Sequence, residues 1–275
     1  MDRHRRLPSP APRGVAGMPA PPLEVVMARL AAAGCVAADE EAVELLAATG
    51  GDGPALEAAL RRRVAGEPLA WITGTVRFCG HDVRVDPGVY VPRPQTEELA
   101  GRAADLLRSL GAGARAVDLC TGAGAVAIHC MAAVPAVLVV GVDCDPRAAR
   151  CARRNGVRTV VGDLGASLAA RCADVVTAVS PYVPTAALAY LPADVQRHEP
   201  RTALDGGADG LDVVRRVVAD AARLLRPGGW LLAELGADQD VLLHPFLEEH
   251  GFGTVTPWRD GEGDLRGVSA RAAGR

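Results

Sequence analysis

The sequence contains no lysine, so all thirty of its basic residues are arginines. Aromatic residues are also scarce, at 3% of 275 residues, and the formal net charge is -3. Surfaces that bind nucleic acid or anionic membranes are normally rich in basic residues. The composition therefore gives no electrostatic case for either partner, and we expect no membrane association and no direct nucleic-acid binding. We interpret the missing lysine as codon bias rather than as a sign of phosphate recognition.

Paired cysteines and long apolar runs are missing as well. The seven cysteines are odd in number and form no CxxC pair, which argues against a disulfide framework or a metal site and favours a reducing compartment. The longest apolar run, "AVLVVGV", is too short to span a bilayer. The basic N-terminus has no apolar segment of the kind found in signal peptides. We therefore predict a cytoplasmic protein without a bound metal.

Hydrophobic residues make up 49% of the chain, which is enough for a substantial core. Residues 1–22 are rich in proline and predict a disordered tail, within which Met18 is an alternative start. Apolar residues at helical spacing over 23–75 predict a small helical domain. Alternation in "VRFCGHDVRV" predicts a β-hairpin connector over 76–94. We assign the remainder, 95–275, to one larger domain.

The larger domain begins with a helix, which we expect to start at Thr96 with the threonine side chain as its cap. After it, apolar segments such as "RAVDLC", "AVLVVGVD" and "ADVVTAV" alternate with helical ones. Strands that are apolar throughout are typical of a parallel sheet with helices on both faces. The segment "FGTVTPWRDGEGDLRGVSARA" predicts a terminal hairpin. The fold class is therefore α/β, with a doubly wound parallel sheet.

A glycine-rich turn, "VDLCTGAGAVAI", lies between the first of these strands and the next helix. Thr121, Gly122 and Gly124 in this turn would let the backbone approach a ligand at the start of a helix. Asp118 precedes the turn, where it can accept hydrogen bonds from a ligand amine or order the loop. Asp143 at the tip of the next strand can accept bonds from two ribose hydroxyls.

Two further acidic residues follow strands. Asp145 is expected to cap the next helix, whereas Asp163 can contact an adenine amine or serve as an ordinary loop acid. Acids after successive strands, together with the glycine turn, indicate a nucleoside-containing cofactor. NAD competes for this site, because Gly122, Gly124 and Ala127 match the GxGxxA pattern of dinucleotide-binding proteins.

Several separate motifs resemble those of the protein-(glutamine-N5) methyltransferases, the HemK/PrmC family that modifies peptide chain release factors. They are "GEPLAWITGTVRFCG", "VYVPRPQTEEL", "VDLCTGAGAVAI", "EPRTALDGGADGLDVVRR" and "LRPGGWLLAELGADQ". The resemblance runs from about Gly66 to the C-terminus, with Gln95 standing where glutamate is usual and Cys120 where the first glycine is usual. It implies a helical N-terminal domain that helps to bind the substrate protein and a Rossmann-like methyltransferase domain with a seven-stranded sheet.

The resemblance also implies a cofactor and a partner. The cofactor would be S-adenosyl-L-methionine, and the residues expected to line its pocket are Asp118, Thr121, Gly122, Gly124, Asp143 and Asp163. NAD then becomes a much weaker candidate for the cofactor, because an NAD-binding site accounts neither for "LDGGADGLD" nor for the Pro-Tyr turn that follows the fourth strand. The substrate would be a protein, with a release factor suspected, and we expect the enzyme to act as a monomer.

The catalytic turn "TAVSPYVP" departs from the family's NPPY motif, in which the asparagine oxygen and the next backbone carbonyl accept bonds from the substrate NH2. Val179 stands for the asparagine and Ser180 for the first proline, while Pro181 and Tyr182 are kept. Valine offers no acceptor, and an unpaired buried N-H costs about 1–3 kcal/mol, or roughly five-fold to over a hundred-fold in rate. A turn shorter by one residue would instead place Ser180 at the polar position.

Alternatives to the glutamine methyltransferase remain open on these residues. One is a methyltransferase that acts on a different nucleophile, such as a small molecule, for which the asparagine is not needed. The other is a catalytically impaired homologue that only binds the cofactor. Glu199 and Arg201 in "QRHEPRTAL" are expected to tie down a loop by hydrogen bonds rather than to take part in catalysis.

Overall fold

A computed structural model describes residues 20–274, so the predicted tail falls almost entirely outside the described residues. The chain divides into two compact units, residues 1–65 and 66–275. No helix within residues 20–274 is both long and apolar enough to cross a membrane.

The first unit consists of three helices packed on one another: α1 (Leu23–Ala32), α2 (Ala38–Thr49) and α3 (Gly53–Val64). Leu30, Leu45 and Leu60, one from each helix, are completely buried, because apolar residues recur on one side of each helix. The third helix starts at Asp52, whose side chain accepts a hydrogen bond from the backbone N-H of Ala55 at 2.8 Å. The helical character predicted for this region is therefore present, with a small core of its own.

The second unit begins with the short helix α4 (Leu69–Thr73) and a two-stranded antiparallel hairpin, β1 (Thr75–Phe78) and β2 (His81–Arg84). The hairpin is grouped with the larger unit, and the division of the chain falls at 65/66, whereas the sequence placed a domain boundary at 75/76.

The main sheet has seven strands in the order β5-β4-β3-β6-β7-β9-β8. Neighbouring strands from β5 to β7 are parallel, whereas β9 pairs antiparallel with both β7 and β8. Their bounds are β3 (Arg115–Leu119), β4 (Leu138–Asp143), β5 (Arg158–Val161), β6 (Ala173–Ala178), β7 (Leu225–Glu234), β8 (Phe252–Arg259) and β9 (Leu265–Ala272). The chain leaves β3 toward β4 and leaves β6 toward β7, so the strand order reverses between β3 and β6. In sheets of this kind, ligands bind at the carboxyl ends of the strands beside such a reversal.

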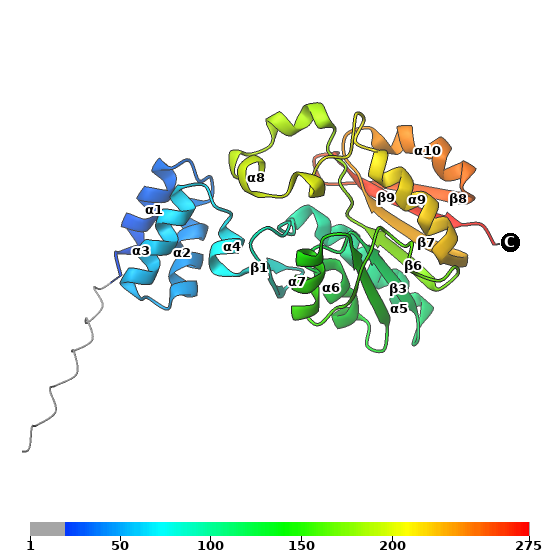
Figure 1. The fold of residues 1–275 in the computed structure, drawn as a ribbon, viewed down its shortest axis with the longest axis horizontal. Coiled ribbons are helices and arrows are strands. Elements are labelled where there is room, and N and C mark those ends of the chain that lie inside the picture. The colour runs from blue at the N-terminus through cyan, green and yellow to red at the C-terminus, as the bar shows by residue number, and fades with distance from the viewer. Residues whose placement is uncertain (1–19, 275) are drawn as a thin grey trace, which may run out of the picture. The chain divides into compact units, whose positions relative to one another are not determined.

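Helices cover both faces of the sheet (Figure 1). On one face, α5 (Glu97–Leu110), α6 (Ala125–Ala133) and α7 (Pro146–Arg154) pack against side chains such as Ala116 of β3. On the other face, α9 (Asp212–Leu224) and α10 (Gln239–Glu249) pack against side chains such as Val117, the next residue along β3. Successive residues of one strand therefore enter different cores, which explains why the strands are apolar throughout and confirms the predicted fold class.

Three details differ from the sequence-based expectations or were not foreseen. Thr96 directly precedes α5, but its side chain makes no capping hydrogen bond, so the predicted cap is wrong. Helix α10 was not predicted. Between β6 and α9 the chain forms short helical turns, η2 (Thr185–Tyr190), α8 (Ala193–His198) and η3 (Arg201–Ala203); a further turn, η1 (Pro94–Thr96), precedes α5.

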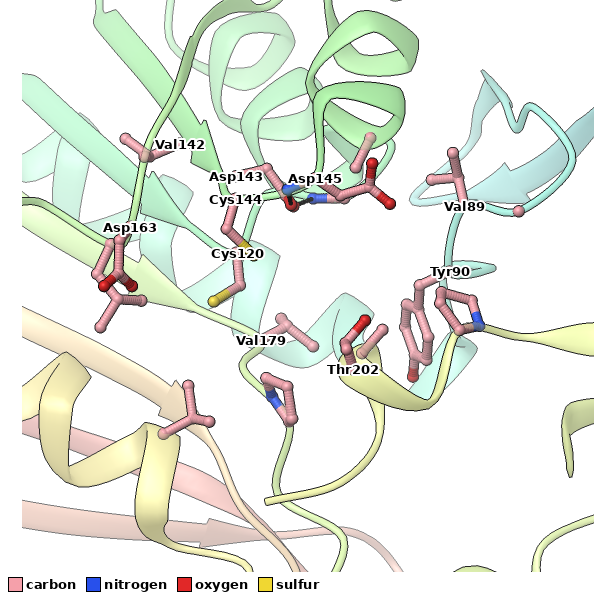
Figure 2. A pocket seen from close by; sticks show the side chains of 18 of the residues that line it. Val89, Tyr90, Cys120, Val142, Asp143, Cys144, Asp145, Asp163, Val179 and Thr202 are labelled. Atoms are coloured by element: carbon pink, nitrogen blue, oxygen red, sulfur yellow. Dashed lines mark hydrogen bonds between the residues drawn. The ribbon is translucent and has the colours of Figure 1, made fainter. Parts of the chain in front are cut away.

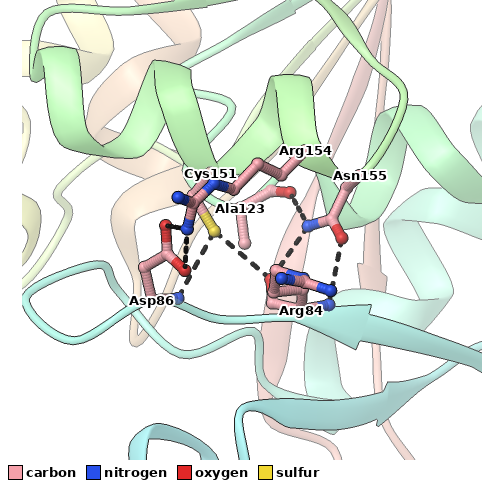
Figure 3. A network of polar contacts seen from close by, with 6 residues as sticks. All are labelled: Arg84, Asp86, Ala123, Cys151, Arg154 and Asn155. Atoms are coloured by element: carbon pink, nitrogen blue, oxygen red, sulfur yellow. Dashed lines mark hydrogen bonds and ion pairs between the residues drawn. The ribbon is translucent and has the colours of Figure 1, made fainter.

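The hairpin is joined to the glycine-rich turn by a polar network (Figure 3). The Asn155 side chain donates to the carbonyl of Arg84 and to that of Ala123, both at 2.8 Å. The Arg154 guanidinium also pairs with Asp86 at 3.1 Å. Because Ala123 belongs to the turn and Arg84 ends the hairpin, Asn155 fixes the segment that follows the hairpin next to the turn.

Candidate functional site

A pocket of about 170 Å³ lies at the carboxyl ends of β3, β4, β5 and β6 (Figure 2). The residues that follow these four strands meet here, as the strand reversal predicts. They include Cys120 and Gly122 after β3, Asp143 at the end of β4, Asp163 after β5 and Val179 after β6.

Asp143 holds the two loops that form the pocket floor. One carboxylate oxygen accepts the N-H of Gly122 and the other accepts the N-H of Asp145, each at 2.9 Å. Each oxygen can still accept a further bond from a ligand hydroxyl. Burial raises the pKa of the Asp143 carboxyl, while the two backbone N-H groups act in the opposite direction.

The glycines of the turn have different tasks. Gly122 lines the pocket with a φ of +55°, whereas Gly124 does not line it. A Cβ on Gly124 would lie 2.8 Å from Val157 Cγ2, and its φ is +85°, so this glycine is required by packing at the start of α6. Cys120 has a φ of +56°, which is the left-handed conformation that glycine adopts most easily.

Asp118 is buried beneath the turn and does not line the main pocket. Its two oxygens accept the hydroxyls of Thr121 at 2.6 Å and Thr177 at 2.7 Å. With Thr121 it borders only a small adjoining cavity of about 40 Å³. Burial raises its pKa to about 6, although both hydroxyls lower it. Of the two roles considered for Asp118, its contacts correspond to ordering the loop.

Asp163 lies at the rim of the pocket, where its side chain is exposed. It accepts a hydrogen bond from the Arg216 guanidinium at 2.6 Å. Arg216 also lines the pocket from α9 and was not identified from the sequence. It lies on a helix rather than after a strand, so no pattern distinguishes it from other exposed arginines.

A second cavity of about 460 Å³ adjoins the first. Ser180, Tyr182 and Glu234 are among the residues that line it, and Val179 and Tyr90 line both cavities. Val179 therefore stands in the wall that the two cavities share. This arrangement allows one reactant to lie in each cavity with the reacting atoms meeting at that wall.

The turn of Val179, Ser180, Pro181 and Tyr182, hereafter the acceptor turn, is held through its backbone. The Gln239 side chain donates to the carbonyl of Tyr182 at 2.8 Å and to that of Asp209 at 3.1 Å. The N-H of Gly206 donates to the Val183 carbonyl at 2.8 Å.

The glycines of "LDGGADGLD" approach this turn so closely that no side chain fits between them. A Cβ on Gly206 would lie 2.7 Å from the Pro181 carbonyl oxygen, and one on Gly210 would lie 2.2 Å from that of Tyr182. The motifs "LDGGADGLD" and "ELGADQ", which the sequence offered only as marks of a family, thus both support the acceptor turn.

Ser180 is the polar side chain of the acceptor turn closest in chain to Val179. It is 2% exposed and lines the second cavity. Its hydroxyl has no hydrogen-bond partner in the described part of the chain. Buried hydroxyls are normally paired, so this one retains both acceptor and donor capacity for a ligand.

Tyr182 points its hydroxyl at a buried carboxylate. It donates to Glu234 at 2.9 Å, and Thr96 donates to the other oxygen of Glu234 at 2.6 Å. Glu234 was not identified from the sequence, although it ends an apolar strand just as Asp143 does. The same signal, an acid at the carboxyl end of a buried strand, would have found it.

The segment after the hairpin contributes the other wall. Tyr90 lines both cavities, and the Arg93 guanidinium lies 5.0 Å from the centre of its ring. Arg93 forms an ion pair with buried Glu199, which also accepts the N-H of Val91. Burial raises the pKa of Tyr90 to about 12, so it remains a neutral phenol at physiological pH. Glu199 thus ties two loops together, as expected from the sequence.

No cluster of three or more potential metal ligands occurs among residues 20–274.

The buried carboxyl of Asp118 generates a prediction about stability without any ligand. Its folded pKa, about 6, exceeds the ordinary value of 3.8. The folded state therefore holds this proton more tightly than the unfolded state does. The resulting stabilisation is complete below pH 3.8, declines between pH 3.8 and 6, and is absent above.

Asp118→Asn tests this, because the amide keeps the shape but cannot ionise. Urea unfolding from pH 4 to 7 should show a shallower decline in unfolding free energy for the variant than for the wild type. Identical pH slopes in the two proteins would show that Asp118 does not titrate in this window.

Comparisons with known proteins identify relatives of the chain, although no protein-family model matches it. It is 39% identical over 230 residues to the release factor glutamine methyltransferase of Gloeobacter violaceus, covering 80% of each chain. It is also 39% identical over 190 residues to the 4-amino-L-phenylalanine/4-methylamino-L-phenylalanine methyltransferase of Streptomyces pristinaespiralis, covering 66% of this chain and 65% of that one.

Among solved structures, the hMettl16 catalytic domain in complex with MAT2A 3'UTR hairpin 6 superposes with a TM-score of 0.56. It is 16% identical and the match covers 77% of this chain and 81% of that one, so the likeness concerns the fold alone.

The predicted methyltransferase class and its dependence on S-adenosylmethionine are confirmed by these relatives, and the NAD alternative is wrong. The chain belongs to the release factor glutamine methyltransferase family.

Proposed function

We propose that the enzyme transfers the methyl group of S-adenosylmethionine to the side-chain amide nitrogen of a glutamine in a protein substrate such as a peptide chain release factor. The observation that carries this proposal is the meeting of two cavities at Val179 and Tyr90, with the acceptor turn between them. The curated relatives named as release factor glutamine methyltransferases support the choice of substrate.

The first cavity suits the cofactor. The Asp143 carboxylate has acceptor capacity left for ribose hydroxyls, and Gly122 leaves the pocket floor free of a side chain. We assign contact with the adenine to Asp163, which pairs with Arg216. Asp118, Thr121 and Gly124 shape the turn from below. When bound, the cofactor supplies a methyl group on a positively charged sulfonium.

The second cavity suits the acceptor nitrogen. An amide nitrogen is a poor nucleophile because its lone pair is delocalised, so its N-H groups must be held in the geometry from which nitrogen attacks. Val179 cannot hold them. We assign the acceptance of one N-H bond to the Ser180 hydroxyl, which is buried and unpaired within the described residues, and that of the second N-H to the Ser180 carbonyl.

The remaining assignments concern the partner and the compartment. We assign recognition of the protein substrate to the helical unit, which forms its own small core, and we assign no membrane or nucleic-acid partner. The enzyme would act as a monomer in the cytoplasm, where the seven free cysteines stay reduced.

A second candidate function is methylation of a small-molecule amine. The observation in its favour is Val179, since an aromatic amine has a more available lone pair than an amide and does not need the asparagine acceptor. The relative from Streptomyces pristinaespiralis is named for such a substrate. A cofactor-binding homologue without catalysis is the third possibility.

Labelled-methyl transfer distinguishes these functions. The wild type should label a glutamine of a release factor. Ser180→Ala should lower the rate by roughly five-fold to a hundred-fold, because it removes the hydroxyl acceptor and leaves one N-H unpaired. Val179→Asn should change the rate by less than about five-fold, because the Ser180 hydroxyl already accepts the N-H that an asparagine would accept.

Calorimetry with S-adenosylmethionine provides the control. Binding without any labelling of glutamine, in either the wild type or Val179→Asn, would reject the glutamine assignment. Labelling of 4-amino-L-phenylalanine instead would establish the second candidate. No binding at millimolar cofactor would eliminate every catalytic function.

Gly210→Ala tests the support of the acceptor turn. A Cβ there would lie 2.2 Å from the Tyr182 carbonyl oxygen and 2.4 Å from Gln239 Nε2, and the φ of this residue is +77°. The turn must therefore shift, and a displacement of about 1 Å costs on the order of a hundred-fold in rate. Methyl transfer should fall by that factor while cofactor affinity, measured by calorimetry, stays within about two-fold. Gly253→Ala, in open space, is the matched control; equal activity of the two variants would contradict this role.

A further inference from the structure

We propose that Glu234, through the hydroxyl of Tyr182, takes up the proton that the acceptor nitrogen loses when it is methylated. This inference rests on the proposed function and adds to it a proton path. The path lies in the second cavity, which both residues line.

The geometry forms a relay. Tyr182 donates its hydroxyl proton to Glu234 Oε1 at 2.9 Å. Its own oxygen can still accept a hydrogen bond, which it would share with the Ser180 carbonyl, from one of the two substrate N-H groups in the cavity. Because Tyr182 lies two residues after Ser180 in the acceptor turn, the same backbone segment carries both the acceptor for the amide and the entry to the relay.

Thr96 orients the carboxylate from the other side. Its hydroxyl donates to Glu234 Oε2 at 2.6 Å instead of capping α5. A threonine before a helix normally stabilises it through a capping bond. The helix start forgoes that bond, and the hydroxyl fixes the plane of the Glu234 carboxylate instead.

Glu234 is a buried carboxyl group without a cation bound to it. It is 2% exposed, and no ion pair joins it to a basic residue within residues 20–274. The two nearest arginines of the cavity have carboxylates of their own, since Arg93 pairs with Glu199 and Arg266 pairs with Asp260 at 2.5 Å. Burying a carboxylate that has only hydroxyl partners costs folding free energy. We therefore look for a functional role that explains why Glu234 is present.

The reaction explains its presence, because methyl transfer moves a positive charge from the sulfur of the cofactor to the acceptor nitrogen. The S-CH3 bond breaks with its electron pair going to sulfur, and the nitrogen lone pair forms the N-CH3 bond. The N-H bond then breaks, its pair stays on nitrogen, and the proton passes to the Tyr182 oxygen as the Tyr182 proton passes to Glu234. Glu234 later releases it to water. Glu234 lies in the second cavity and not in the first. It therefore stabilises the positive charge more after the methyl group has reached the nitrogen than before the transfer.

The state of Glu234 depends on its surroundings. The titratable and charged groups around it are Tyr182 after β6, Tyr90 and Arg93 from the segment after the hairpin, and Arg266 on β9. Burial raises the pKa of Glu234, whereas the Thr96 and Tyr182 hydroxyls and the two arginines lower it. Proton uptake needs the ionised form, so kcat should decline as pH falls through this raised pKa.

The test compares Glu234→Gln and Tyr182→Phe with the wild type, using the full chain and whichever acceptor the wild type methylates. General-base catalysis contributes about 10²–10⁴-fold, so kcat should fall at least a hundred-fold in both variants. The acid limb of the kcat profile should disappear in Glu234→Gln. Cofactor affinity by calorimetry should stay within two-fold, because Glu234 does not line the first cavity.

Asp174→Asn is the control. It makes the same acid-to-amide change at the amino end of β6, where Asp174 pairs with Arg226 at 2.8 Å, and it should leave kcat and its pH profile unchanged. Retention of kcat within two-fold in Tyr182→Phe, or an unchanged acid limb in Glu234→Gln, would overturn the relay while leaving the proposed function standing. If the wild type methylated neither a release factor nor 4-amino-L-phenylalanine, the proposed function and the relay would both fall.

Discussion

The architecture of the site depends on the hydrogen bond from the Gln239 side chain to the backbone carbonyl of Tyr182. The acceptor turn leaves β6 into a buried position without regular secondary structure, so its carbonyl groups need partners from elsewhere. Gln239 serves Tyr182 and Asp209 together, and in this way joins the turn to the glycine-rich segment that packs on it. Because Gly206 and Gly210 bring backbone against backbone, the turn has little room to move.

The acceptor turn separates the two cavities, and the carboxylates in these cavities have different hydrogen-bond partners. The first cavity contains Asp143, whose oxygens accept backbone N-H groups, and at its rim Asp163 pairs with Arg216. The second cavity contains Glu234, whose oxygens accept two hydroxyls. Electrostatic stabilisation requires groups that are fixed before the reaction begins. Asp143 is fixed by the backbone N-H groups of Gly122 and Asp145, and Glu234 is fixed by the hydroxyls of Thr96 and Tyr182.

The sequence predicted those features that depend on residues close together in the chain. Apolar strands, the cap at Asp145 and the acids at strand ends follow from periodicity and short-range hydrogen bonding, and the Asp145 side chain does accept the N-H of Arg147 at 2.8 Å. The Thr96 cap was mispredicted because a partner far along the chain, Glu234, takes the hydroxyl. Arg216 could not be predicted, since only the folded sheet brings α9 beside Asp163. The closeness of "LDGGADGLD" to the acceptor turn is likewise visible only in three dimensions.

The substitution of Val179 for asparagine has a different meaning once its surroundings are known. An asparagine acts as an acceptor, and its replacement removes one acceptor from the wall between the cavities. Yet the next residue carries a buried hydroxyl without a partner in the described chain, and a buried unpaired hydroxyl costs about 1–3 kcal/mol of folding free energy. A structural serine at this position would have a bond to a neighbour. Ser180 has none among residues 20–274. In the proposed function a substrate N-H group satisfies its hydroxyl, which would offset the acceptor lost at Val179 one residue further along the same turn.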